Sequence, residues 1–339
     1  MTELSLHSAA IMLTKRLGRL AAVLVIVAAA AFTLAKLSPI DPVNAYLGID
    51  IARVGPEQRA LIAARWGLDQ PPLAQFLHWA GNLLQGDLGY SMIYNAPVAE
   101  VIASRFWVSL PLVGLAWLFS GALGFALGVV AGASSGTLLD RAIRIYAYVL
   151  ASAPTFWIAI LLLIIFAVQL GWAPVCCAGP LGVVPDDVTF ADRLRHLALP
   201  LAALTLFGVA QIALHTRAKI IEILQGDAAL YARAQGAGKW DVALRHGARN
   251  AALPAVTILF ASLGELFGGS ILAEQVFAYP GLGQAAVSAG IKGDVPLLLA
   301  VTIFLTLFVS VGNMIADMLY RLVDPRLRDE ALSAGGQHG

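Results

Sequence analysis

Glu265 is the residue of this chain whose type and setting suit chemistry best, because it is a lone carboxylate inside a long apolar stretch. Gly264, Gly268 and Gly269 surround it in the sequence. A carboxylate withdrawn from water costs a few kcal/mol or more unless it faces a wet cavity or a partner. Two roles are open: together with the three glycines it lines a passage and meets a cationic group there, or it is a neutral or paired residue at a subunit interface.

No constellation for covalent chemistry accompanies Glu265. The sequence has no Gly-x-Ser-x-Gly, no His-Glu-x-x-His, no phosphate-binding loop and no paired carboxylates at a suitable spacing. We therefore expect no catalytic residue, no metal site and no enzyme activity. The two cysteines, Cys176 and Cys177, are adjacent, a spacing that rarely gives a good disulfide and does not match a zinc site. We interpret them as small loop residues, with a soft-metal contact as the alternative.

The segment 227–254, DAALYARAQGAGKWDVALRHGARNAALP, is polar and net basic and lies between two long apolar runs. Its first part has high helix propensity, Gly236 and Gly238 interrupt it, and a helical pattern resumes at Lys239 before Pro254 begins the next apolar run. The segment is predicted to form a short helix, a turn and a second helix, a shape suited to a groove in a soluble partner. A solvated basic loop that only fixes topology is the alternative.

The composition decides the class of protein that carries these residues. The chain has 339 residues, of which 59% are hydrophobic and only 13% charged. A soluble globule of this size would need roughly twice that charged fraction on its surface. The chain is therefore predicted to be an all-α membrane protein that crosses the bilayer several times.

Uncharged runs locate the spans, because a bilayer core of about 30 Å needs about 20 apolar residues of helix. Six runs qualify. They lie at about 20–37, inside 106–139, inside 145–185, and at about 196–216, 251–276 and 296–320.

Basic residues accumulate on the side of the membrane that is not translocated. With the N-terminus inside, the inner segments hold 14 of the 22 Lys and Arg residues. Both termini are therefore predicted to be cytoplasmic. The predicted division is a cytoplasmic tail 1–19, a first span 20–37, an extracytoplasmic segment 38–105, a five-helix core 106–322 that includes the loop 227–254, and a cytoplasmic tail 323–339.

Two features concern packing. Residues 56–90 of the outer segment have helical periodicity punctuated by Pro71, Pro72 and Gly86, which predicts two short helices at the membrane interface. They either dock a partner or cap the bundle.

The second span carries small residues at intervals of four, which let another helix approach closely in lipid. These residues are Gly124, Gly128 and Gly132. Gly264 and Gly268 repeat this spacing in the fifth span.

The loop 227–254 resembles the EAA loop of ATP-binding-cassette (ABC) importer permeases. That loop has Ala-Arg-Ala, then Gly one residue on, and later Arg-Asn with Leu-Pro at the next span. The matching residues here are Ala232, Arg233, Ala234, Gly236, Arg245, His246, Arg249, Asn250, Leu253 and Pro254. The chain departs from the pattern at Ala228, where an aromatic residue is usual, and at Gln235, where Lys is usual; Tyr231 is a candidate for the missing ring.

Further segments resemble the peptide/nickel branch of these permeases. They are SPIDPV, GLDQP, NLLQGDLGYS, PVAEVI, EQVFAYPGLG and VDPRLR, and they extend the resemblance from about residue 11 to 328. The resemblance implies the type I ABC importer permease fold, with about six transmembrane helices, in the bacterial cytoplasmic (inner) membrane.

The resemblance also implies partners. They are a second homologous permease, two cytoplasmic ATPase subunits that bind ATP and Mg, an extracytoplasmic solute-binding protein and membrane lipid, with no nucleic acid and no cofactor on this chain. The ATPase-coupling residues would be Ala232, Arg233, Ala234, Gln235, Gly236, Arg245 and His246, with the coupling helix at 232–236.

The solute is less defined. The resemblance implies peptides or nickel and other metal chelates, and GELFGG at 264–269 is closer to the metal-chelate importers. The rival from another class is an ion-coupled secondary transporter in which Glu265 carries protons, although neither inverted repeats nor a pair of broken helices is visible. An assembly factor without transport activity is a third alternative.

Overall fold

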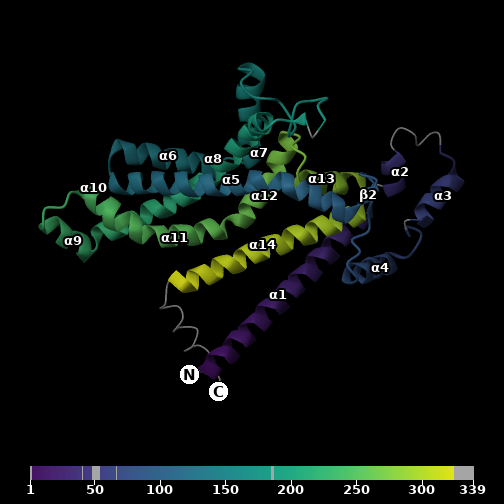
Figure 1. The fold of residues 1–339 in the computed structure, drawn as a ribbon, viewed down its shortest axis with the longest axis horizontal. Coiled ribbons are helices and arrows are strands. Elements are labelled where there is room, and N and C mark those ends of the chain that lie inside the picture. The colour runs from purple at the N-terminus through teal and green to yellow at the C-terminus, as the bar shows by residue number, and fades with distance from the viewer. Residues whose placement is uncertain (1, 40, 48–53, 66, 185–186, 324–339) are drawn as a thin grey trace. The chain divides into compact units, whose positions relative to one another are not determined.

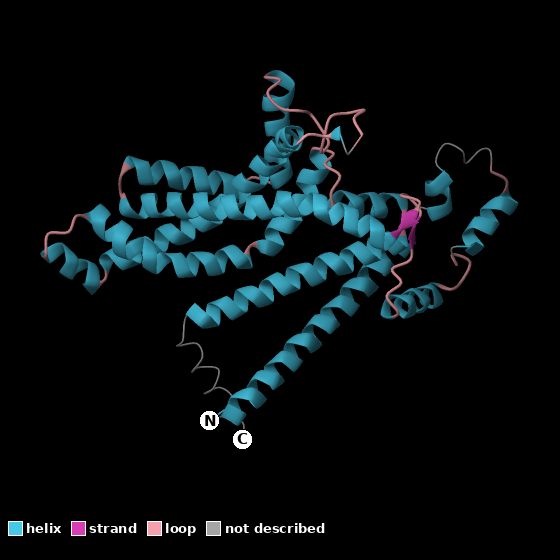
Figure 2. Ribbon diagram, viewed as in Figure 1, coloured by secondary structure: helices cyan, strands magenta, loops and turns pink. Residues whose placement is uncertain are grey.

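The structure is a computed structural model that describes residues 2–39, 41–47, 54–65, 67–184 and 187–323. The described chain is almost entirely helical (Figures 1 and 2). The α-helices are α1 (Thr2–Leu37), α2 (Pro42–Leu47), α3 (Pro56–Arg65), α4 (Pro72–Leu84), α5 (Val98–Ala133), α6 (Leu138–Ser152), α7 (Thr155–Leu162), α8 (Phe190–Gln225), α9 (Asp227–Ala234), α10 (Lys239–Asp241), α11 (Ala248–Ala261), α12 (Leu263–Val276), α13 (Leu282–Lys292) and α14 (Val295–Val323). Two π-helices, η2 (Leu163–Gln169) and η4 (Val242–Gly247), and a hairpin of β1 (Tyr90–Ser91) and β2 (Ala96–Pro97) complete the elements.

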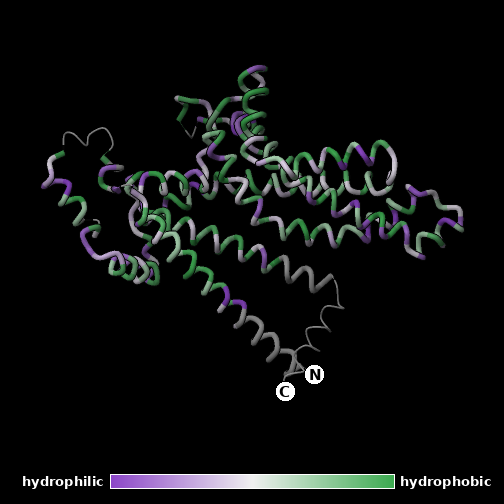
Figure 3. Tube along the Cα trace, turned by 180° about the vertical axis from the view of Figure 1, so that it is seen from behind, coloured by the Kyte–Doolittle hydropathy of each residue, from purple (hydrophilic) through white to green (hydrophobic). Residues whose placement is uncertain are grey.

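The membrane-crossing helices agree with the predicted number. Four described helices are long and apolar enough to cross a bilayer, and the number rises to six if each of two bent helix pairs is one span. Hydrophobic residues follow the long helices, whereas hydrophilic residues gather at the α9–α10 end (Figure 3). The predicted all-α fold with about six spans is confirmed. Residues 324–339 of the predicted C-terminal tail lie outside the described residues.

Two predicted spans differ in detail from the structure. The third is bent by 105° between α6 and the α7–η2 pair, and residues 170–184 of the uncharged run form a loop. Pro154 explains the bend, because a proline disfavours the helical conformation at the residue before it, and Ala153 is extended. The fifth span is bent by 49° between α11 and α12, at Ser262.

The chain forms two compact units, and the first comprises residues 1–108 and 281–310. It contains the predicted interfacial helices as α3 and α4, together with a hairpin that the sequence analysis did not predict. Asp294 is fully buried and accepts hydrogen bonds from the Ser91 hydroxyl at 2.7 Å and the Ile93 N–H at 3.1 Å. Its other oxygen accepts the Leu297 N–H at 3.2 Å, so one carboxylate caps α14 and holds the hairpin.

The second unit comprises residues 109–280 and 311–339 and depends on a close contact between α5 and α8. A methyl group added at Gly124, Gly128 or Gly132 would lie 2.8, 2.5 or 2.6 Å from the Cβ atom of a residue on α8. The three partners are Ile212, Thr216 and Ile220, which are also four residues apart. The predicted role of the glycine stripe in the second span is therefore confirmed.

We expect Gly128→Ala to destabilise the protein, because the new methyl group would meet the Thr216 Cβ at 2.5 Å and the Ala213 carbonyl oxygen at 2.7 Å. Overpacking of this kind costs about 1–3 kcal/mol in the free energy of unfolding. Gly114→Ala is the matched control, because Gly114 is on the same helix and a methyl group added there would have no described atom within 4 Å. Unfolding of both variants in lipid nanodiscs measures the difference; equal stabilities would contradict the packing argument.

Candidate functional site

The segment 227–254 forms the predicted helix, turn and second helix. Helix α9 ends at Ala234, Gln235 is its C-terminal cap, and Gly236 has a φ angle of 93°. This left-handed conformation stops the helix, and glycine adopts it without steric cost. The coupling helix predicted at 232–236 is therefore wrong in its limits, because only residues 232–234 of that range are helical.

Helix α9 is attached firmly to the end of α8. Ala229 is buried in an apolar cluster with Ile220 and Leu224 of α8 and Val242 of η4. The Arg233 Nη2 atom donates a hydrogen bond to the Leu224 carbonyl at 3.0 Å. A displacement of α9 must therefore also displace the end of α8.

The segment exposes four large apolar or aromatic side chains among its polar ones. Leu230, Tyr231, Trp240 and Leu244 have 46–67% of their surface exposed. Exposed aromatic and aliphatic side chains that lie close together mark surfaces for protein partners. The sequence analysis singled out only Tyr231; the other three could have been found as large apolar residues in a polar loop between spans.

The two remaining predicted coupling residues lie on η4, next to α9. Arg245 is exposed and pairs with Asp241 at 2.8 Å, a surface ion pair that contributes little to stability. His246 is also exposed. Single-turn π-helical insertions occur frequently at functional sites. The fold thus brings Ala232, Arg233, Ala234, Gln235 and Gly236 close to Arg245 and His246, because α9 and η4 share the same apolar cluster.

A buried ion pair that the sequence analysis did not predict joins α6 to α8. Asp140 has 1% of its side chain exposed and accepts from the Arg217 Nε and Nη2 atoms at 2.5 and 2.9 Å. It also accepts the Gly136 N–H at 3.0 Å. The pair could not be predicted from the sequence, because its two residues are 77 positions apart and give no local signal.

We expect Asp140→Asn to lower the free energy of unfolding by about 3 kcal/mol, because it leaves the Arg217 guanidinium without a counterion at a largely buried position. The matched control is Glu222→Gln, which breaks the exposed pair of Glu222 with Lys219 and should cost about 1 kcal/mol or less. Unfolding of the two variants in nanodiscs gives the comparison. A loss for Asp140→Asn no larger than for the control would be evidence against the role of the buried pair.

Glu265 projects from the exposed side of α12 and meets α8. The Gln211 Nε2 atom donates to the Glu265 Oε2 atom at 2.9 Å. Gly268 is exposed, and a methyl group added there would have no described atom within 4 Å, so no helix in the described part of the chain packs closely against it. Gly269 is buried, and a methyl group added there would lie 3.4 Å from Leu204. Gly264 is half-buried.

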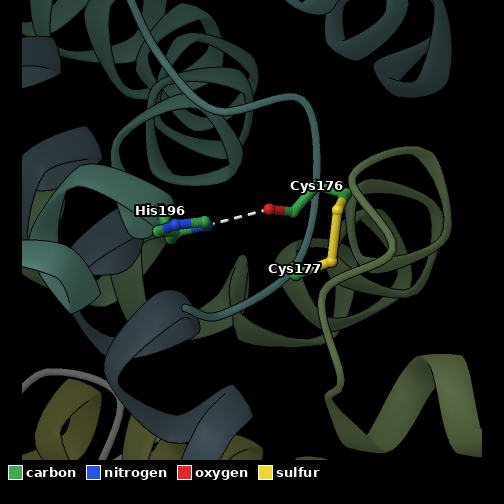
Figure 4. The surroundings of a disulfide bond; sticks show 3 residues. All are labelled: Cys176, Cys177 and His196. Atoms are coloured by element: carbon green, nitrogen blue, oxygen red, sulfur yellow. Dashed lines mark hydrogen bonds between the residues drawn. A yellow bond between two sulfur atoms is a disulfide. The ribbon is translucent and has the colours of Figure 1, made fainter. Parts of the chain in front are cut away.

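The loop 170–184 carries the two cysteines (Figure 4). The structure records a disulfide between Cys176 and Cys177, which corrects the interpretation of two unbonded loop residues. His196 Nδ1 donates to the Cys176 carbonyl at 2.8 Å, and the Cys177 N–H donates to the Phe277 carbonyl at 2.9 Å. The loop is therefore held against the start of α8 and the turn after α12.

In the turn after α12, burial raises the pKa of the Tyr279 hydroxyl to about 12, so the hydroxyl stays protonated.

Comparison with known proteins identifies the family. Residues 124–329 match the family described as "binding-protein-dependent transport system inner membrane component". The chain belongs to this family. It is therefore a multi-pass protein of the inner membrane, as predicted.

Curated relatives match almost the whole chain. The chain is 32% identical to the oligopeptide transport system permease protein AppB of Bacillus subtilis, over 87% of this chain and 92% of that one. It is 33% identical to the di/tripeptide transport system permease protein DppB of Pseudomonas aeruginosa, over 94% and 98%. It is 36% identical to a putative peptide transport system permease protein of Brucella abortus, over 94% and 98%.

A solved structure supports the fold. The chain resembles a chain of the MetNI methionine ABC transporter in an inward-facing conformation, with a TM-score of 0.51 and 19% identity over 67% of this chain and 97% of that one. The predicted type I ABC importer permease fold is confirmed. In the part of the chain that the structure describes, no group of three or more His, Cys, Asp or Glu residues gathers as metal ligands.

Proposed function

We propose that the chain is a permease subunit of a binding-protein-dependent ABC importer for peptides. The membership of the family and the peptide permeases among the relatives support this proposal. The observation that carries it is α9, a short helix attached to α8 by buried contacts that presents an apolar and aromatic surface outside the spans. Nickel and metal chelates, which the sequence also suggested, are the alternative solutes, and uptake assays with both classes separate them.

In this proposal the chain lies in membrane lipid and acts with three kinds of protein partner. A second homologous permease completes the passage, two cytoplasmic ATPase subunits bind ATP and Mg, and a solute-binding protein delivers the solute to the outer face. The chain itself hydrolyses nothing and holds no cofactor. The rival, an ion-coupled transporter, would need no protein surface on α9 and receives no support from the family of the chain.

The proposed mechanism is alternating access driven through α9. A groove of the ATPase subunit receives α9, and closure of the ATPase pair displaces it. The buried Ala229 and the hydrogen bond from Arg233 to Leu224 pass the displacement to α8. The Asp140–Arg217 pair then carries it to α6, and the close glycine contact carries it to α5. Several spans thus move together.

Two residue sets take roles in this mechanism. Ala232, Arg233, Ala234, Gln235, Gly236, Arg245 and His246 belong to the ATPase-coupling surface, to which the exposed Leu230, Tyr231, Trp240 and Leu244 are added. Glu265, Gly264 and Gly268 belong to the wall of the translocation pathway, and Gly269 packs behind this wall against Leu204 and Thr155. Glu265 and Gly268 support that assignment best, because both are exposed on this chain.

We expect Trp240→Ala to weaken the association of ATPase subunits about tenfold or more, because large aromatic residues at interface centres contribute about 2 kcal/mol or more. The measurement is co-purification and titration of the ATPase subunits in nanodiscs. Trp172→Ala is the matched control, because Trp172 is 67% exposed but lies in the loop before α8, on the predicted outer face. Equal losses in the two variants would exclude a specific role for Trp240.

Uptake into proteoliposomes tests the proposed function as a whole. The complete complex should accumulate labelled peptide only when ATP is present on the side of the ATPase subunits and the binding protein is on the other side. Uptake driven by an ion gradient without ATP would instead support the ion-coupled rival. Failure of any ATPase subunit to bind this chain would overturn the proposal.

A further inference from the structure

One face of α8 is polar and exposed inside a helix that is apolar enough to cross the membrane. The exposed positions Gln211, His215, Ala218 and Glu222 are spaced by four, three and four residues, so they share one face. They extend for about 16 Å along the helix at 1.5 Å per residue. Polar residues in a span face water or protein rather than lipid. Gln211 and His215, which lie within the predicted span 196–216, therefore face a hydrated passage or another subunit.

Glu265 stands at the far end of that face from Glu222. It receives one hydrogen bond, from Gln211 to its Oε2 atom, and among the described residues no cation pairs with it. Two basic side chains of α8 are already engaged, because Arg217 binds Asp140 and Lys219 binds Glu222. The Glu265 charge is thus left for a partner that is not part of the described chain.

The surroundings of Glu265 have room and acceptors for such a partner. Gly268 lies about one turn along α12, and a methyl group added there would have no described atom within 4 Å. The Gln211 amide uses its Nε2 atom as a donor to Glu265, so its oxygen remains an acceptor. A carboxylate oxygen and an amide oxygen next to open space suit an ammonium group, which has three donors and one positive charge.

A divalent metal ion fits this place less well. Mg²⁺ and Ca²⁺ require six or more oxygen ligands, and their protein sites are built from several carboxylates and carbonyls. Glu265 is the one carboxylate here, and no metal-binding group of His, Cys, Asp or Glu occurs among the described residues. The chemistry therefore favours a monovalent organic cation.

We propose that Glu265, Gln211 and the space beside Gly268 form a binding site for the primary ammonium group of the transported solute, such as the free amino terminus of a peptide. This inference rests on the proposed function. Carboxylate and amide oxygens bind the ammonium group as it leaves the binding protein, and the exposed polar face of α8 provides His215 as the next polar contact toward Glu222. The ion pair also removes the cost of the lone carboxylate.

The test uses the complete transporter in proteoliposomes and compares a tripeptide that has a free amino terminus with its N-acetylated form. The pair is chosen so that the binding protein binds both peptides and the wild type carries both. The variants are Glu265→Gln, which keeps the size and removes the charge, Glu265→Asp, which keeps the charge, and Glu100→Gln as the control. Glu100 is an exposed carboxylate in the first turn of α5, in the other unit.

We expect Glu265→Gln to slow uptake of the free tripeptide about tenfold, while uptake of the acetylated form, ATP hydrolysis and assembly of the complex change less than twofold. Glu265→Asp should recover part of the loss, and Glu100→Gln should resemble the wild type for both peptides. An equal effect on both peptides, no effect on either, or loss of assembly would overturn the ammonium site. Absence of ATP-driven uptake in the wild type would overturn the proposed function as well, and this failure is visible before any variant is compared.

Discussion

The close approach of α5 to α8 is the interaction on which the second unit depends. Lipid offers no hydrophobic driving force for helix association, so small residues and short interhelical distances must supply it. Three glycines at intervals of four meet three α8 residues at the same intervals, and no side chain larger than hydrogen fits at these positions. Helix α8 is thereby fixed, and the groups that concern function are arranged around it.

Two carboxylates in contact with α8 show how setting decides role. Asp140 is buried and receives two hydrogen bonds from one guanidinium and one from a backbone N–H, so its charge is neutralised inside the chain. Glu265 is exposed and receives one hydrogen bond from a neutral amide. The first arrangement joins a helix pair, whereas in the second no cation of the described chain pairs with the carboxylate. The two carboxylates thus differ in their burial and in their hydrogen-bond partners, although both are acidic residues.

The sequence predicted those features that repeat at short range. Uncharged runs located the spans, the glycine interval predicted the α5–α8 contact, and the pair Gly236 and Gly238 located the turn after α9. Features that depend on contacts between distant residues could not be predicted. They include the Asp140–Arg217 ion pair and the hydrogen bonds that Asp294 accepts from the β1–β2 hairpin. The disulfide of two adjacent cysteines also escaped prediction, because that spacing rarely gives one. The bend at Pro154 could be predicted only in part. A proline indicates that the helix breaks, but not that the angle is 105°.

Two residues that follow the bend at Ser262 lie at very different distances from it. Glu265 lies three residues beyond the bend, about 4.5 Å along the axis, whereas Phe277 lies fifteen residues beyond it, about 22 Å. The Phe277 carbonyl holds the cysteine loop through the Cys177 N–H. A tilt of α12 about Ser262 would therefore shift the cysteine loop about five times as far as Glu265.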